Sequence, residues 1–267
     1  MNDLDEQEEQ LAHQALELLE LTFLHAEDRS ERIALLCDRS YAAISRVAAI
    51  CVRPPHVSLC RTTLDALGER RVKVVGAVNF STGAASVDTM VMEAELALSS
   101  GSDEIDLMYP FHSLLAGDSR RGETLIRRCR DITLGKAGLT VSLGAGELRD
   151  PQLIRAACLA ALEGGADFIK IAAGRVLTQD TPQAVRIMLE AVADGGGLVG
   201  IKVAGGMRTF AEARVYLRMV QERFGPWWLC PERVRLGTAS LLDDLVNRLG
   251  LADRGQKKTR QEPGLKP

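Results

Sequence analysis

Two short apolar runs decide the fold: Ala166-Asp167-Phe168-Ile169-Lys170 and Leu198-Val199-Gly200-Ile201-Lys202. Each run has the length of a buried strand, and each ends in a lysine. The segment between them includes residues 182–192, which are long enough to form a helix. A strand, a helix and a second strand in succession predict two parallel strands covered by a helix.

The same alternation extends outward in both directions along the chain. The expected strands are Glu20–Phe23, Val47–Val52, Val72–Val78, Glu104–Tyr109, Leu139–Leu143, Phe168–Ile171, Val199–Val203 and Val234–Leu236. Helices are expected at 4–19, 87–99, 150–163, 182–192 and 210–223. Eight strand–helix units predict an α/β fold, a (β/α)₈ TIM barrel with an extra N-terminal helix. An open doubly wound sheet is the alternative, but no G-x-G-x-x-G follows the first strand.

Composition narrows the class of protein. The chain has 267 residues, 46% of them hydrophobic, and a net charge of −3, which gives no support for nucleic-acid binding. No apolar run is long enough to span a membrane, and the acidic start does not resemble a targeting signal. Six scattered cysteines and four histidines without metal-ligand spacing predict a reduced, cytoplasmic protein with no metal. One domain is expected over 1–252, followed by a disordered polar tail over 253–267.

Lysine is rare in this chain, with only seven among its 33 basic residues. Lys170 and Lys202 nevertheless stand at the ends of successive strands, where the active site of a barrel lies. An amine can act as a nucleophile, which an arginine cannot, so a Schiff base is the leading chemistry. If the two ammonium groups approach each other, their repulsion would lower the pKa of one of them.

Asp106 is the third candidate for a chemical role. It alternates with apolar residues in the strand that begins at Glu104, so both carboxylates should face the same side. A buried carboxylate needs a partner, so Asp106 is either part of a structural ion pair or a proton-transfer group beside the lysines.

Glycine-rich turns follow the last two strands, Ala204-Gly205-Gly206-Met207-Arg208-Thr209 and Leu236-Gly237-Thr238-Ala239-Ser240. Loops at these positions of a barrel often bind phosphate through backbone amides and a helix N-terminus. Thr209 and Glu212 form a capping-box pattern that marks a helix start. A phosphate site with Arg208 as its cation is therefore expected, although such glycines also make plain turns.

Together these segments resemble 2-deoxyribose-5-phosphate aldolases, which are class I aldolases with a (β/α)₈ fold. The resemblance rests on residues 165–170, 199–209, 103–106 and 237–242. It implies that Lys170 forms the Schiff base, that Lys202 lowers the pKa of Lys170, and that Asp106, Lys202 and a water relay protons. It also implies reversible cleavage of 2-deoxyribose 5-phosphate, in deoxyribonucleotide catabolism, to acetaldehyde and glyceraldehyde 3-phosphate, without a cofactor. The phosphate-binding residues it implies are Gly174, Arg175, Gly205, Gly206, Arg208, Gly237 and Ser240. Members of the family often form homodimers.

The chain departs from the family pattern at several polar positions. Ala172 and Ala173 replace hydroxyl residues, Arg175 replaces a lysine, and Thr140 and Gly144 stand where a lysine and a glutamate are common. Ala239 replaces a serine, and the tail carries no tyrosine. These changes predict a roomier, less polar site with weaker phosphate dependence. Two alternatives stay open: a Schiff-base aldolase with another acceptor, or a non-catalytic barrel that binds a sugar phosphate.

Overall fold

The computed structural model describes residues 3–24, 46–172 and 181–251. Its strands are β1 Leu19–Phe23, β2 Ala49–Val52, β3 Lys73–Val78, β4 Glu104–Met108, β5 Gly138–Leu143, β6 Phe168–Ala172, β7 Gly200–Ala204 and β8 Val234–Gly237. Its helices are α1 Asp3–Glu17, α4 Val57–Ala66, α5 Val87–Ser99, α6 Phe111–Leu115, α7 Arg120–Thr133, α8 Ala145–Leu148, α9 Pro151–Glu163, α10 Thr181–Asp194, α11 Phe210–Phe224 and α12 Leu242–Arg248. Two 3₁₀ turns, η1 Pro54–His56 and η2 Pro226–Trp228, complete the described elements.

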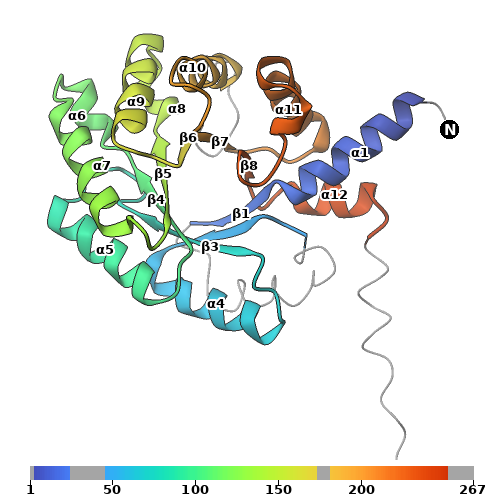
Figure 1. Cartoon of the computed structure of the whole chain (residues 1–267), viewed down its shortest axis with the longest axis horizontal. Coiled ribbons are helices and arrows are strands. Elements are labelled where there is room, and N and C mark those ends of the chain that lie inside the picture. The colour runs from blue at the N-terminus through green and yellow to red at the C-terminus, as the bar shows by residue number, and fades with distance from the viewer. Residues whose placement is uncertain (1–2, 25–45, 173–180, 252–267) are drawn as a thin grey trace, which may run out of the picture.

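The eight strands form a closed parallel barrel in the order of the chain, and helices surround it (Figure 1). β1 closes the barrel by pairing with both β2 and β8. The TIM-barrel prediction is therefore confirmed, and the open doubly wound sheet is wrong. No helix among the described residues is long and apolar enough to cross a bilayer.

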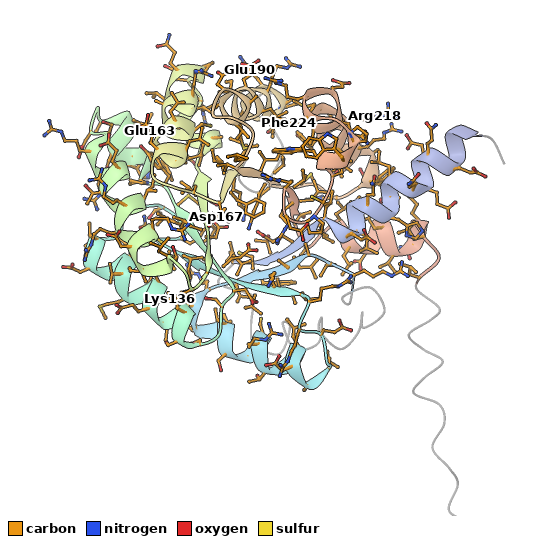
Figure 2. The ribbon with its side chains drawn as sticks, in the orientation of Figure 1. Lys136, Glu163, Asp167, Glu190, Arg218 and Phe224 are labelled. Carbon is orange, nitrogen blue, oxygen red and sulfur yellow. The ribbon has the colours of Figure 1, made fainter. Side chains whose placement is uncertain are left out.

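Helix ends follow the capping signals of the sequence. The Thr209 side chain accepts from the Glu212 amide, and the Glu212 carboxylate accepts from the Thr209 amide, so the capping box at the start of α11 is confirmed. Asp150 caps α9, which begins at Pro151, as the pattern of a polar cap before proline favours. The extra helix α1 packs beside α11 and α12, where Glu8 pairs with Arg218 at 2.9 Å (Figure 2).

Alternation along the strands separates two kinds of side chain. Branched residues such as Leu21, Ile105 and Ile169 belong to the main apolar core, which also contains residues of the surrounding helices. A separate small cluster contains Ala49, Cys51, Val75 and Ala77 from β2 and β3, with Leu24. The interior of a barrel is normally filled by bulky apolar side chains. Here small residues leave room for charged ones.

Those charged side chains come from five strands. Three carboxylates and three cations are buried there: Glu20, Glu104, Asp106, Lys170, Lys202 and Arg235. Isolated charges are costly to bury, and they are tolerated only when paired and hydrogen-bonded. Equal numbers of opposite charges allow each buried charge to be paired.

Candidate active site

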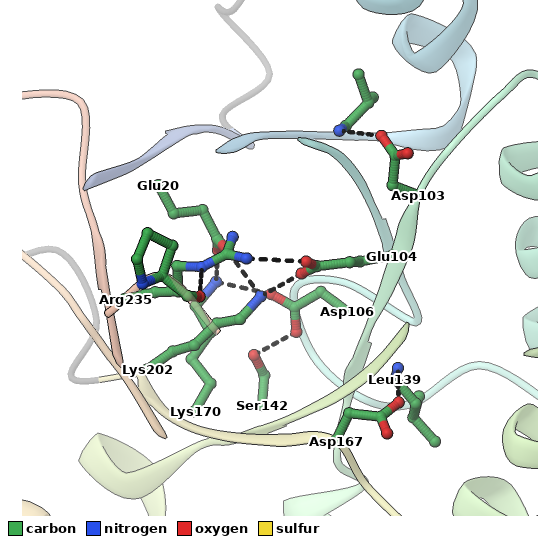
Figure 3. A network of polar contacts seen from close by, with 12 residues as sticks. Glu20, Asp103, Glu104, Asp106, Leu139, Ser142, Asp167, Lys170, Lys202 and Arg235 are labelled. Carbon is green, nitrogen blue, oxygen red and sulfur yellow. Dashed lines mark hydrogen bonds and ion pairs between the residues drawn. The ribbon is translucent and has the colours of Figure 1, made fainter. Parts of the chain in front are cut away.

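Lys170 lies on β6 with its side chain only 4% exposed. Its Nζ donates to Asp106 Oδ2 at 2.7 Å and to Glu20 Oε1 at 3.2 Å (Figure 3). Glu20 comes from β1 and Asp106 from β4, so three strands meet at this one amine. The sequence analysis predicted that Asp106 lies close to Lys170, and in the structure the two side chains are in direct contact.

Lys202 lies beside Lys170, because the Cα atoms of the two lysines are partners in the β6–β7 register. Its Nζ does not contact Asp106. It donates instead to Glu20 Oε2 at 2.7 Å and to Glu104 Oε2 at 2.9 Å, with its side chain fully buried. The same ammonium group lies 4.8 Å from the centroid of the Phe168 ring, a cation–π distance.

Arg235 on β8 completes the network. Its Nη2 donates to Glu104 Oε1 at 3.0 Å, and its Nη1 lies 3.8 Å from Glu20 Oε2. Glu104 therefore joins Arg235 to Lys202, while Glu20 joins Lys202 to Lys170. The expectation that Glu104 and Asp106 face the same side of β4 is confirmed by these contacts.

Sequence reasoning missed Glu20 and Arg235. The signal for Glu20 was present, because a carboxylate inside the apolar run Leu19-Glu20-Leu21 is as conspicuous as Asp106 is in β4. Its partners Lys170 and Lys202 are 150 and 182 residues away, so no local pattern links them. Arg235 stands in the same way between Val234 and Leu236, and alternation alone would have placed it inside the barrel.

The electrostatics of the two lysines differ from the expectation. Burial by itself lowers the pKa of Lys170, but the carboxylates of Asp106 and Glu20 raise it well above its ordinary value. Burial also lowers the pKa of Lys202, but the carboxylates of Glu104 and Glu20 outweigh this effect, so that the pKa of Lys202 is raised as well. The prediction that Lys202 depresses the pKa of Lys170 is wrong for this state of the protein, because Glu20 bridges the two ammonium groups.

The pKa values of the carboxylates Glu20 and Glu104 are shifted in the opposite direction, downward. Burial raises the pKa of Glu20, yet Lys202, Lys170 and Arg235 together hold it well below its usual range. The pKa of Glu104 is lowered in the same way, against burial, by Lys202 and Arg235. Glu20 and Glu104, like the two lysines, are therefore ionised near neutral pH.

Glu20, Asp106 and the Cys51 thiol place one potential metal-ligand atom each within 4.8 Å of the others. Both carboxylates, however, already pair with the Lys170 ammonium group. Burial raises the pKa of Cys51 well above its ordinary value, so the thiol stays protonated and is a poor ligand. The oxygen atoms of Glu20 and Asp106 and the protonated Cys51 thiol therefore fit a buried lysine ammonium group better than a divalent cation.

Five of the predicted phosphate-site residues lie on one rim of the barrel, at the ends of β7 and β8. The Gly205 amide donates to the Gly237 carbonyl at 3.4 Å, and Thr238 Oγ1 donates to the Met207 carbonyl at 3.0 Å, so the two turns are joined. Arg208 and Ser240 are exposed there, beside Gly206. Gly174 and Arg175 lie outside the described residues.

Gly237 also connects this rim to the lysine. A Cβ atom at Gly237 would lie 3.4 Å from Lys170 Cε and 2.9 Å from the Ala204 Cβ. The end of β8 therefore approaches the amine as closely as a glycine allows. The rim with the predicted phosphate residues and the buried amine belong to one region.

The backbone amides at the N-terminus of α11, which were expected to bind phosphate, already have hydrogen-bond acceptors. The Arg208 and Thr209 amides both donate to Glu212 Oε2, at 2.7 and 3.0 Å. The Phe210 amide donates to Asp244 Oδ2 at 2.8 Å. Carboxylates of the chain itself thus occupy three amides at this helix start, and the Gly205 and Ser240 amides donate to Gly237 and Thr238. Among the described residues of this rim, the exposed side chains of Arg208 and Ser240 are the candidates to contact a phosphate.

Two departures from the family pattern have visible structural effects. A Cβ atom at Gly144 would lie 2.6 Å from Phe111 Cδ1, so the Phe111 ring fills the space beside that glycine. The prediction that the change at 144 enlarges the pocket is therefore wrong at this position. Thr140 is buried on β5 and its hydroxyl makes no hydrogen bond.

A cavity of about 150 Å³ lies elsewhere, lined by residues of α8, α9 and α10 together with Ile171. Ile171 follows Lys170 in β6, so the two side chains point to opposite faces of the strand. This cavity is therefore on the helix side of the barrel wall and not beside the charged network.

Comparison with known proteins agrees with this architecture. Residues 12–242 match the model of the DeoC/LacD family aldolases. A candidate deoxyribose-phosphate aldolase from Toxoplasma gondii ME49 superposes with a TM-score of 0.85 at 26% identity, covering 95% of this chain and 99% of that one. The apo form of a candidate deoxyribose-phosphate aldolase from the same organism superposes with a TM-score of 0.83 at 28% identity, covering 92% of this chain and 99% of that one. A tetrameric deoxyribose phosphate aldolase from Aeropyrum pernix, at 18% identity with 92% and 97% covered, shares the fold with a TM-score of 0.71. The chain belongs to the DeoC/LacD family of aldolases.

Proposed function

We propose that this aldolase forms a Schiff base on Lys170 and reversibly cleaves 2-deoxyribose 5-phosphate to acetaldehyde and glyceraldehyde 3-phosphate. The observation that carries the proposal is the placement of Lys170 Nζ inside the barrel, 2.7 Å from Asp106 and 3.2 Å from Glu20, next to the end of β8 at Gly237. A buried lysine paired with carboxylates on two other strands is suited to amine chemistry. The names of the relatives favour this substrate over others.

The reaction in the synthetic direction begins with a proton transfer. Lys170 gives a proton to Asp106, and the free amine attacks the acetaldehyde carbonyl to form a carbinolamine. Asp106 returns this proton to the carbinolamine hydroxyl, which leaves as water, and the resulting iminium ion carries its positive charge between Glu20 and the ionised Asp106. Asp106 and Glu20, which raise the pKa of Lys170 against its burial, stabilise a cation on that nitrogen. The same field favours the iminium over the neutral amine.

The carbon–carbon bond forms in the next stage. A base removes a proton from the methyl carbon of the iminium, and the electron pair moves to make a neutral enamine. The enamine carbon attacks the acceptor aldehyde, and hydrolysis of the new iminium releases the product. We assign the role of this base to Asp106. Lys202 holds Glu20 in place and takes part in returning the proton through a water molecule.

The acceptor phosphate would lie on the rim of Gly205, Gly206, Arg208, Gly237 and Ser240, with Gly174 and Arg175 as further proposed contacts. Support comes from the joining of the two turns and from the exposure of Arg208 and Ser240. The proposal also includes a cytoplasmic place in deoxyribonucleotide breakdown and a homodimeric assembly, which rest on the family resemblance.

Borohydride trapping tests the proposal directly. The protein is incubated with acetaldehyde, reduced, digested and mapped by mass spectrometry, with Lys170→Met as the negative variant. Lys73→Met is the matched control, because Lys73 also lies on a strand but at the opposite rim, half exposed beside Asp103. We expect an ethyl adduct on Lys170 in the unmodified protein and in the Lys73 variant. An adduct on Lys202 would reverse the roles, and no adduct on either would refute the Schiff base.

A further inference from the structure

Ser142 extends the charged network by one hydroxyl group. It lies on β5 with 3% of its surface exposed, and its Cα pairs with that of Lys170 in the β5–β6 register. Its Oγ lies 2.5 Å from Asp106 Oδ1, inside the barrel (Figure 3). Because the carboxylate beside a lysine ammonium group is an acceptor, the serine hydroxyl is the donor.

The two oxygens of Asp106 therefore have different partners. Oδ1 accepts from Ser142, and Oδ2 accepts from Lys170 Nζ at 2.7 Å. A carboxyl group on a short side chain can rotate about its terminal bond, and a single contact would leave that rotation open. A second, short, charge-assisted hydrogen bond from another strand holds the carboxylate plane in one orientation.

We propose that Ser142 is a positioning residue for the aldolase reaction, which holds Asp106 so that Oδ2 faces the carbon acid on Lys170. This inference rests on the proposed function, since it concerns the base in that reaction. When the Lys170 nitrogen becomes the iminium, the methyl carbon is two bonds away from the atom that Oδ2 already contacts. A fixed Oδ2 is then near the proton that must be removed.

The step that Ser142 supports is a balanced proton transfer. A C–H bond of the iminium methyl group breaks, and its proton goes to Asp106 Oδ2. The electron pair forms the C=C bond, while the electrons of the C=N bond return to the nitrogen and give the neutral enamine. Ser142 keeps its own proton throughout and acts only through Asp106.

Thr140 provides a matched comparison on the same strand. It lies two residues before Ser142, faces the same side of β5 and is fully buried. Its hydroxyl makes no hydrogen bond, although the Cα atoms of Thr140 and Asp106 are partners in the register. Burial of a hydroxyl on this strand therefore does not by itself produce a contact with Asp106.

The experiment follows exchange of the acetaldehyde methyl hydrogens in D₂O by NMR, which needs no acceptor and reports proton removal alone. The full chain is compared with Ser142→Ala, Ser142→Cys, Ser142→Thr and Thr140→Val, each checked for folding by thermal melting. We expect Ser142→Ala to slow exchange by roughly 10- to 100-fold, as small misplacements of reacting groups do. KM for 2-deoxyribose 5-phosphate should stay within about twofold while kcat falls, because binding is not affected.

The other variants separate positioning from packing. Ser142→Thr keeps the hydroxyl and should restore most of the exchange rate, and Ser142→Cys, a weaker donor, should be intermediate. Thr140→Val should exchange like the unmodified protein. The inference is overturned if Ser142→Ala exchanges at the unmodified rate, if Ser142→Thr fails to restore it, or if Thr140→Val loses as much.

Borohydride trapping on the same samples distinguishes this inference from the proposed function. We expect the Ser142→Ala variant to retain the Lys170 adduct at the end point, because the serine does not contact the amine. A missing adduct in the unmodified protein would refute the proposed function and this inference with it. A normal adduct with unchanged exchange in Ser142→Ala would refute the inference alone.

Discussion

Lys170 and Lys202 are neighbours in register on β6 and β7, and a single carboxylate holds both of them. Glu20 contacts Lys170 through Oε1 at 3.2 Å and Lys202 through Oε2 at 2.7 Å. Two ammonium groups this close would repel each other, but the negative carboxylate between them attracts both and offsets the repulsion. The network therefore stabilises positive charge on Lys170, which is the charge that an iminium carries.

Glu20→Gln should separate the reactivity of Lys170 from the stability of the barrel. With one of its two carboxylate partners neutral, the pKa of Lys170 should fall, and a larger share of the amine is free at pH 7. We expect faster borohydride-trapped adduct formation at neutral pH. Breaking the buried pair should also destabilise the fold by about 3–5 kcal/mol.

Glu20→Asp is the control for that experiment, because it keeps the charge and changes only the length of the side chain. Its adduct formation should follow the pH dependence of the unmodified protein more closely than that of Glu20→Gln. Slower trapping in Glu20→Gln at every pH would contradict the electrostatic account of Lys170.

The stability of the protein should depend on pH at both ends of the scale. The pKa values of Glu20 and Glu104 are lowered in the folded state from an ordinary value of 4.5. Their contribution is therefore present above pH 4.5 and is lost as the pH falls toward the folded values, by about 1.4 kcal/mol per pKa unit of difference.

The lysines act in the opposite direction. Their pKa values are raised above 10.5, so their contribution is present below pH 10.5 and is lost as the pH rises through the folded values. Urea unfolding from pH 2 to 12 would measure the onset of both limbs. Glu8→Gln, at a partly exposed ion pair with Arg214 and Arg218, is the control and should leave the acid limb in place.

Gly237→Ala should impair activity more than stability. The new Cβ would lie 2.9 Å from the Ala204 Cβ and 3.4 Å from Lys170 Cε, so the end of β8 must move away from the amine. We expect kcat/KM to fall by roughly 100-fold, in line with displacements of about 1 Å near reacting groups. Gly195→Ala is the control, because its Cβ would meet the flexible Leu162 side chain at 3.3 Å and the Ala191 carbonyl oxygen only at an ordinary contact distance of 3.4 Å. Steady-state kinetics with both variants would show the difference, and equal losses would contradict it.

A double-mutant cycle tests the packing of Phe111 against Gly144. Gly144→Ala should destabilise the protein by about 1–3 kcal/mol, because its Cβ would lie 2.6 Å from Phe111 Cδ1. In a Phe111→Ala background the same change should cost little, since the space is then open. Denaturant unfolding of the four proteins gives the coupling energy. A value near zero would mean that Phe111 does not fill this space in solution.

The preference for a phosphorylated substrate should be modest. Carboxylates already occupy three amides at the start of α11, so fewer donors remain for a phosphate than the sequence suggests. We expect kcat/KM for 2-deoxyribose 5-phosphate to exceed that for 2-deoxyribose by less than about 1000-fold, or about 4 kcal/mol. Arg208→Gln should reduce the ratio further by lowering only the rate with the phosphate. A preference of many thousand-fold would refute the relaxed specificity.

The sequence by itself determined the barrel and some of the charged groups at its centre. Alternation of apolar strands with helical segments depends on local periodicity, so the eight strands were predicted to within a few residues at their ends. Lys170, Lys202 and Asp106 could be singled out because a charge at the inner face or the end of an apolar strand is rare. The capping box of Thr209 and Glu212 is also a local pattern, and it formed as expected.

Only the tertiary structure decided which charges pair. Glu20 reaches both lysines from a strand that is distant in sequence, whereas Ser142 and Arg235 join the network through its carboxylates. Closure of β1 against β8 brings the first and last strands together. The direction of the pKa shift at Lys170 depends on the balance of charges around it, and no spacing of residues encodes that balance. The space beside Gly144 was likewise filled by Phe111 from another element. Local periodicity specifies elements, whereas the distances between them, and therefore the electrostatics, exist only in the closed barrel.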